Sequence, residues 1–171
     1  MPRYRMTLEY DGSGFVGWQR QATGMSVQQA LEEAILKLSG ETVRVWGAGR
    51  TDSGVHALAQ VAHFDLAAPQ PLKAIKDALN FHVRPNPVAV IHAVEAKPDF
   101  DARFSAIQRT YRYRILNRNA PAILDMGKVW FVRHPLKLEP MQEAASRLVG
   151  HHDFSSFRAI KCQANSPERT M

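Results

Sequence analysis

The feature that most constrains the fold is a well-marked helix at residues 26–40, set between segments that alternate like β-strands. Ser26 stands at a helix N-cap with Gln29 three residues on, and Gly40 occupies a C-terminal cap position. Apolar residues recur at helical spacing between the two caps, at Val27, Ala30, Leu31, Ala34, Ile35 and Leu38. A helix with one apolar face must bury that face, and the nearest apolar surfaces are strands. The sequence therefore predicts a mixed α and β domain.

Residues 1–98 read as one complete unit of six elements in the order β-α-β-β-α-β. That order predicts an α+β fold of the ferredoxin-like, or RRM-like, arrangement. The Lys97-Pro98-Asp99 stretch is a candidate domain boundary, so we expect an N-terminal domain at residues 1–98. The expected strands span residues 3–10, 42–46, 60–66 and 87–96, and the expected helices span residues 26–40 and 72–81.

The remaining residues, 99–171, resemble the first part of a second α/β domain. We expect strands at 110–117 and 128–132, a helix at 139–149, and a further strand that has barely begun at residue 171. One helix and two or three strands would leave a sheet face open to water, which is costly in apolar burial. The sequence therefore predicts that this second domain is incomplete, with its last elements supplied from elsewhere or missing.

The charge balance favours a polyanionic partner. The net charge is +6 and the isoelectric point is near 9.8, and Lys and Arg that neutralise phosphates release condensed counterions. A basic surface that only maintains solubility is the alternative, and charge alone leaves both open. No apolar run approaches the roughly 18–20 residues that span a bilayer. Cys162 is the single cysteine, so an intramolecular disulfide is excluded and a cytoplasmic setting is the simplest expectation.

The densest chemical signal is the glycine-rich stretch Gly47–His56, between two expected strands. It is not a phosphate-binding P-loop, because no Gly-Lys-Ser/Thr follows, and Asp52 occupies the third glycine position of a dinucleotide fingerprint. Two interpretations stay open. One is a tight turn in which Asp52 bonds its own backbone; the other is a catalytic pair in which Arg50 keeps the Asp52 carboxylate ionised and oriented.

A metal site is a weaker hypothesis. His151-His152-Asp153 is compact, but adjacent histidines point different ways on a regular element and no His-x-x-x-His or Cys-x-x-Cys spacing is present. We expect no metal ligands and assign these side chains to packing or hydrogen bonding.

Several sequence blocks occur in the order found in one protein family. Together they span the chain, and they resemble the tRNA pseudouridine synthases of the A type. The blocks are Glu9-Tyr10-Asp11-Gly12, Phe15-Val16-Gly17-Trp18-Gln19, Gly49-Arg50-Thr51-Asp52-Ser53-Gly54-Val55-His56-Ala57, Gln60-Val61-Ala62-His63-Phe64, Phe100-Asp101-Ala102-Arg103-Phe104-Ser105-Ala106, Arg109-Thr110-Tyr111-Arg112-Tyr113 and Gly150-His151-His152-Asp153-Phe154-Ser155-Ser156-Phe157.

The resemblance implies specific roles. Asp52 would be the essential aspartate that attacks or deprotonates the target uridine, Arg50 would assist base flipping, and Tyr111 would stack on the base. RNA contacts would come from two further regions, at Phe100, Asp101, Arg103 and Phe104, and at Cys162 and Gln163. The reaction is an isomerisation that needs no cofactor. The implied partners are the anticodon arm of tRNA and a second copy of the chain in a homodimer.

The chain differs from the family pattern in its length, which supports a second hypothesis. The family's second domain continues beyond the length of this chain and holds a further basic active-site residue. A catalytically inactive tRNA-binding module is therefore the alternative to an active isomerase.

Overall fold

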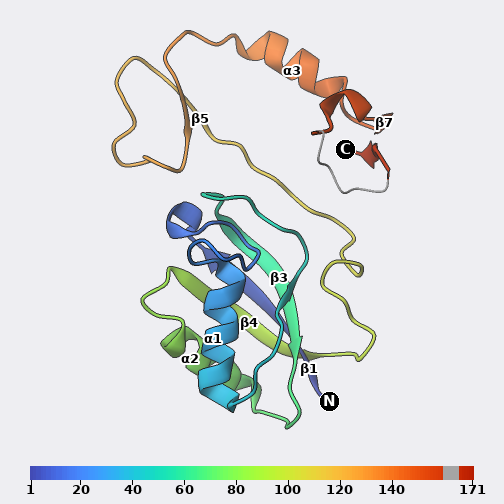
Figure 1. Cartoon of the computed structure of the whole chain (residues 1–171). Helices are drawn as coiled ribbons and strands as arrows, with labels where there is room; N and C mark the ends of the chain where they lie inside the picture. The colour runs from blue at the N-terminus through green and yellow to red at the C-terminus, as the bar shows by residue number, and fades with distance from the viewer. Residues whose placement is uncertain (160–165) are drawn as a thin grey trace. The chain divides into compact units, whose positions relative to one another are not determined.

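The computed structural model describes residues 1–159 and 166–171, which fall into two compact units (Figure 1). The first unit contains residues 1–113 and 125–128, and the second contains residues 114–124 and 129–171. Helices and largely antiparallel strands confirm the α+β class. The sequence predicts a domain boundary at residues 97–99, but the segment 99–113 that follows it lies in the first unit.

The first unit is a four-stranded antiparallel sheet with both of its helices against one face (Figure 1). Along the sheet the strand order is β2-β3-β1-β4, and along the chain the elements run β1-α1-β2-β3-α2-β4. Their bounds are β1 Arg3–Tyr10, α1 Val27–Ser39, β2 Trp46–Gly47, β3 Ala57–Asp65, α2 Leu72–His82 and β4 Val88–Ala96.

Strand β1 is the centre of the core. Its even-numbered side chains Tyr4, Met6, Leu8 and Tyr10 are all buried, because successive residues of a strand point to opposite faces. Met6 lies opposite Ala62 of β3 and Ala93 of β4. Each large apolar side chain buried in this way stabilises the fold by about 1.5–3 kcal/mol.

The caps predicted for α1 are confirmed. The Ser26 hydroxyl accepts a hydrogen bond of 3.1 Å from the Gln29 amide. Gly40 has φ +74° and its amide donates to Leu36 O at 2.8 Å, a conformation that glycine adopts without steric cost.

The strand expected at residues 42–46 is wrong except at its last residue. Only Trp46 and Gly47 pair with β3, so β2 is a two-residue strand. The reason lies in α1. The Gln28 side-chain amide donates to Val45 O at 3.0 Å, and Glu32 accepts from the Val45 amide at 3.2 Å. These side chains satisfy the backbone groups that a strand partner would otherwise bond.

The second unit holds short elements. Strand β5 pairs in parallel with β6, and β7 pairs antiparallel with β8. The strand expected at 110–117 is confirmed only over its last three residues, because β6 offers just three partners. The expected helix at 139–149 ends three residues earlier, and none of its described residues is buried. The bounds are β5 Ile115–Asn117, β6 Trp130–Val132, α3 Leu138–Ser146, β7 His151–Asp153 and β8 Glu168–Thr170.

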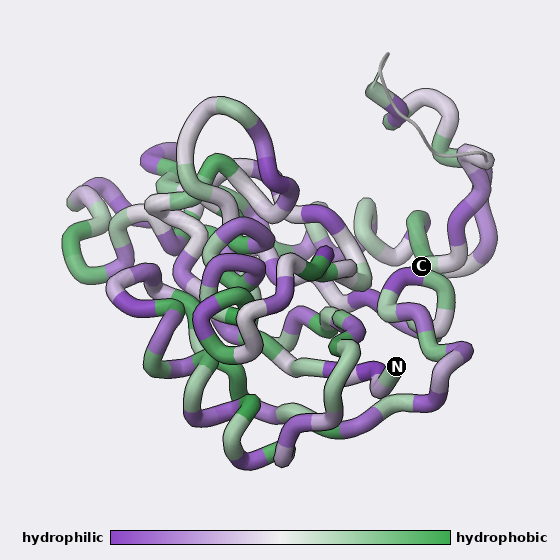
Figure 2. The backbone as a smooth tube through the Cα atoms, turned by 60° about the horizontal axis from the view of Figure 1, so that its bottom comes forward, coloured by the Kyte–Doolittle hydropathy of each residue, from purple (hydrophilic) through white to green (hydrophobic). Residues whose placement is uncertain are grey.

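Hydrophobic and hydrophilic residues alternate in short runs along the chain, as the colours of Figure 2 show. Among the described residues, no helix is long and apolar enough to cross a membrane.

Candidate active site

The loop that joins β2 to β3 carries Arg50 and Asp52, and its backbone is held from both ends. At its start, the Ala48 amide donates to Val61 O at 2.8 Å, which extends the pairing of the two strands. Near its end, the Val55 amide donates to Asp52 O at 3.2 Å and closes a turn at Gly54, whose φ is +80°. The loop is therefore an ordered turn that presents Asp52 at its tip.

A second loop, between β1 and α1, clamps the first one. The Trp18 amide donates to Thr51 O at 2.9 Å, and the Ser53 hydroxyl donates to Phe15 O at 3.1 Å. Gly17 makes this approach feasible. Its φ is +116°, and a β-carbon there would lie 2.7 Å from Thr51 O. The Phe15–Gln19 block thus supports the loop that carries Asp52.

A partly buried polar network contacts the loop. The Tyr10 hydroxyl is 2.8 Å from the Thr51 hydroxyl, and the Gln60 side-chain amide donates to Gly49 O at 2.6 Å. Burial raises the pKa of Tyr10, although hydrogen bonds to Thr51 and Gln60 act to lower it. The neutral phenol is therefore favoured as a fixed hydrogen-bonding partner of the loop. Residues 49 and 51 are tied down, which orients the residues beside them.

Asp52 and Arg50 themselves are exposed and line one pocket of about 440 Å³. Val16, Trp18, Arg20 and Ser53 also line it. In the described part of the chain, no ion pair joins Arg50 to Asp52, and no hydrogen bond reaches the Asp52 carboxylate. The carboxylate is thus presented to the pocket with its neighbours fixed and its oxygens available to a substrate.

The predicted RNA-contacting segment forms a tight turn at Phe100–Ser105. Asp101 Oδ1 accepts from the amides of Arg103 at 2.7 Å and Phe104 at 3.0 Å. Burial acts to raise the pKa of Asp101, but these two hydrogen bonds and nearby positive charge outweigh burial and lower it. The Asp101 carboxylate shapes the turn, while the side chains of Arg103 and Phe104 are exposed, with the Arg103 guanidinium 5.4 Å from the Phe104 ring centre.

His63 attaches this turn to the sheet. Its Nδ1 accepts from the Ala102 amide at 3.1 Å, and its ring meets Phe100 edge-on at 5.9 Å between ring centres. Only 3% of His63 is exposed, and burial lowers its pKa, with the Arg3 charge acting in the same direction. The neutral ring is therefore the form that the fold favours, and it is the form that can accept the Ala102 hydrogen bond.

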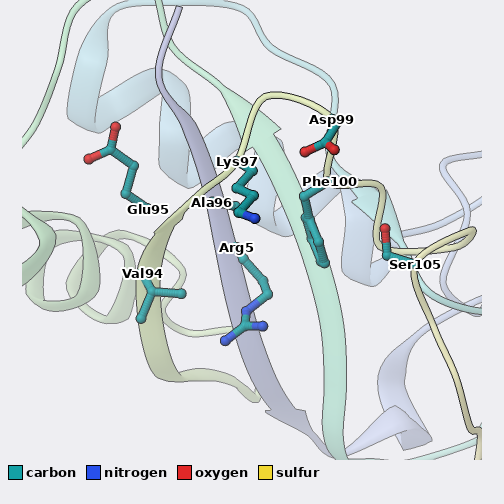
Figure 3. A pocket seen from close by; sticks show the side chains of 8 residues that line it. All are labelled: Arg5, Val94, Glu95, Ala96, Lys97, Asp99, Phe100 and Ser105. Carbon is teal, nitrogen blue, oxygen red and sulfur yellow. The ribbon is translucent and has the colours of Figure 1, made fainter.

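Phe100 also borders a second pocket, of about 390 Å³, beside β1 and β4. Figure 3 shows its ring beside Arg5 and Lys97, with Arg5 5.8 Å from the ring centre. Glu95 and Asp99 line the same pocket, so charges of both signs meet there and a phosphate gains little from it.

Tyr111 lies on the segment 106–114, which has no regular secondary structure, and 71% of it is exposed. Within the described residues, no hydrogen bond joins Tyr111 to Asp52, and Tyr111 is not among the residues that line the Asp52 pocket. Cys162 and Gln163 lie outside the described residues. Among the residues that are described, no three His, Cys, Asp or Glu side chains form a group able to hold a metal ion.

Sequence reasoning did not assign a role to three residues that hold the loop, namely Tyr10, Gln60 and Arg109. Arg109 donates to Ala48 O through Nε at 3.0 Å and through Nη2 at 2.8 Å. The sequence predicted the strand that contains Tyr10, but no local pattern indicates which distant group a polar side chain will bond.

Comparison with known proteins identifies the family in which this loop belongs. Residues 6–105 match the family model of the tRNA pseudouridine synthases. The whole chain is 59% identical to "tRNA pseudouridine synthase A" of Rhodospirillum rubrum, over 171 residues that make up 62% of that relative. It is 60% identical to the protein of the same name from Rhodospirillum centenum and 54% identical to that from Parvibaculum lavamentivorans, covering 70% of each. The chain therefore belongs to the tRNA pseudouridine synthase family, and it spans roughly two thirds of the length of these relatives.

Proposed function

We propose that this chain carries the catalytic centre of a tRNA pseudouridine synthase, which converts uridine to pseudouridine in the anticodon stem-loop of tRNA. The observation that carries the proposal is the exposed Asp52 carboxylate on a loop whose neighbouring residues are fixed by Trp18, Gln60 and Tyr10. An ionisable carboxylate that an ordered loop presents to a pocket suits nucleophilic or general-base catalysis.

In the proposed reaction Asp52 attacks or deprotonates the target nucleoside as the bond from uracil N1 to ribose C1′ breaks. The freed uracil rotates, and its C5 forms the new bond to C1′. The proton on C5 is lost and N1 gains one, so substrate and product have the same atoms. No electrons are transferred overall, so the reaction requires no redox cofactor.

Arg50 and Tyr111 are proposed to act on the target base. A uridine inside a stem-loop must leave the stack before its glycosidic bond can be reached. Arg50 lines the same pocket as Asp52, which supports the proposal that its side chain fills the gap left by the flipped base. Tyr111 is exposed and free to stack on the base.

Arg103 and Phe104 are proposed to contact the RNA backbone and bases beside the target. Both side chains are exposed on the Phe100–Ser105 turn. An arginine beside an aromatic ring suits a phosphate and a stacked base together. We extend this contact role to Phe100, Cys162 and Gln163 on the family resemblance alone.

The net charge of +6 fits a substrate that is itself a polyanion. We further propose that the protein acts in the cytoplasm, where its tRNA substrate is found. We also propose that it works as a homodimer.

The test replaces Asp52 by asparagine, which keeps the size of the side chain and removes its charge. Pseudouridine formation on an unmodified tRNA transcript should fall by about 10⁴-fold or more, the scale seen when a nucleophile is removed, while tRNA affinity is retained. Asp77→Asn is the matched control, because Asp77 is an exposed carboxylate on α2 that pairs with Lys73. An Asp52→Asn chain that still converts uridine at the wild-type rate refutes the proposal.

The second candidate is a tRNA-binding module without catalysis, which the net charge of +6 fits equally well. The wild-type chain should be assayed beside a version extended to the relatives' length. Salt-sensitive binding with conversion by the longer form alone would support this second candidate for the 171-residue chain.

A further inference from the structure

Arg109 makes three hydrogen bonds that join two separate parts of the first unit. Its Nε and Nη2 both donate to Ala48 O, at 3.0 and 2.8 Å, and Nη2 also donates to Arg103 O at 2.7 Å. Ala48 begins the loop that carries Asp52, and Arg103 belongs to the Phe100–Ser105 turn. One guanidinium therefore ties these two segments together.

The residues that these contacts join lie close in sequence to the proposed site residues. Ala48 stands two residues before Arg50, and Tyr111 stands two residues after Arg109. We propose that Arg109 is a positioning residue, which holds the Asp52 loop at a fixed distance from the RNA-contacting turn so that both engage one substrate. The proposal rests on the proposed function for its consequence in catalysis, but its structural part can be measured without activity.

The chemistry of arginine suits this role. Its planar guanidinium offers donors in fixed directions and can bridge two carbonyl oxygens. A lysine ammonium carries the same charge on a flexible stem without that fork.

The experiment compares Arg109→Ala and Arg109→Lys with Arg112→Ala. Arg112 is exposed on the same segment, and among the described residues it has no hydrogen bond or ion pair. Removing it subtracts the same charge without touching the loop. Three quantities are measured for each chain: amide hydrogen exchange at Trp18 and Val55, the affinity for a tRNA transcript, and the single-turnover rate of pseudouridine formation. The Trp18 and Val55 amides report on the loop because they donate to Thr51 O and Asp52 O.

We expect Arg109→Ala to speed exchange at both amides by about tenfold, the effect of losing about one net hydrogen bond, and Arg112→Ala to leave them unchanged. Arg109→Lys should recover part of the protection. The two alanine variants should lose similar tRNA affinity, while only Arg109→Ala lowers the single-turnover rate, by about tenfold or more.

Unchanged exchange in Arg109→Ala overturns the positioning role, whatever the activity. Equal rate losses in Arg109→Ala and Arg112→Ala also overturn it, because charge alone would then explain both. If the wild-type chain forms no pseudouridine, the proposed function fails for this chain, and the exchange data alone decide whether Arg109 positions the loop.

Discussion

Replacing Gly17 by alanine should displace the loop that carries Asp52. Gly17 has φ +116°, which L-residues rarely adopt, and its missing side chain faces the loop backbone. An added β-carbon would lie 2.7 Å from Thr51 O, 3.3 Å from the Asp52 carbonyl carbon and 3.4 Å from the Ser53 amide nitrogen. All three are backbone atoms, so no side chain can rotate away to relieve the contact.

The cost has two parts. Holding an L-residue in a sparsely populated backbone conformation costs about 1–3 kcal/mol. The contact with Thr51 O must be relieved as well, and moving the loop weakens the hydrogen bond from the Trp18 amide, worth about 1 kcal/mol. We expect Gly17→Ala to lower the free energy of unfolding by about 2–4 kcal/mol. It should also reduce pseudouridine formation, by more than substitutions that leave the loop with Asp52 in place.

Urea unfolding followed by tryptophan fluorescence measures the stability change. Trp18 is 3% exposed whereas Trp46 and Trp130 are 49% and 66% exposed, so the change in emission reports mainly on the surroundings of Trp18. Gly14→Ala is the control, because a β-carbon at Gly14 would meet nothing within 4 Å. A Gly17→Ala protein within about 0.5 kcal/mol of wild type, the range of neutral surface changes, would refute the steric reasoning.

The remaining predictions concern two buried polar side chains. Tyr10→Phe removes the hydroxyl that meets Thr51, so stability should fall by about 1 kcal/mol and the rate of pseudouridine formation should fall with it. Tyr4→Phe loses the bond from the Gln70 amide at a similar cost in stability and should keep the rate, so equal rates in the two variants would contradict the role of Tyr10. Burial lowers the pKa of His63, so the unfolded chain binds a proton at His63 more readily than the folded chain does. The free energy of unfolding should therefore be highest above the ordinary histidine pKa of about 6.5 and should decrease as the pH falls below it. His63→Asn, which keeps an acceptor for the Ala102 amide, should flatten that part of the curve of unfolding free energy against pH, and an unchanged curve would show that another group titrates.

Short-range signals in the sequence determined the parts of the fold that depend on neighbours along the chain. Helix α1 has its caps at Ser26 and Gly40 because a hydroxyl and a left-handed glycine satisfy helix ends locally. The inward face of β1 follows from strand alternation. The loop with Arg50 and Asp52 could be located from its glycines and from its resemblance to a family.

The tertiary structure alone decided which distant groups hold that loop and where pairing stops. Strand β2 is short because side chains of α1 bond the Val45 backbone, 13 and 17 residues away in the sequence. The Tyr10–Thr51 and Arg109–Ala48 contacts join residues 41 and 61 positions apart. Local propensity contains no information about such pairs, because a polar side chain takes whichever buried partner the packing of the sheet and helices brings within reach.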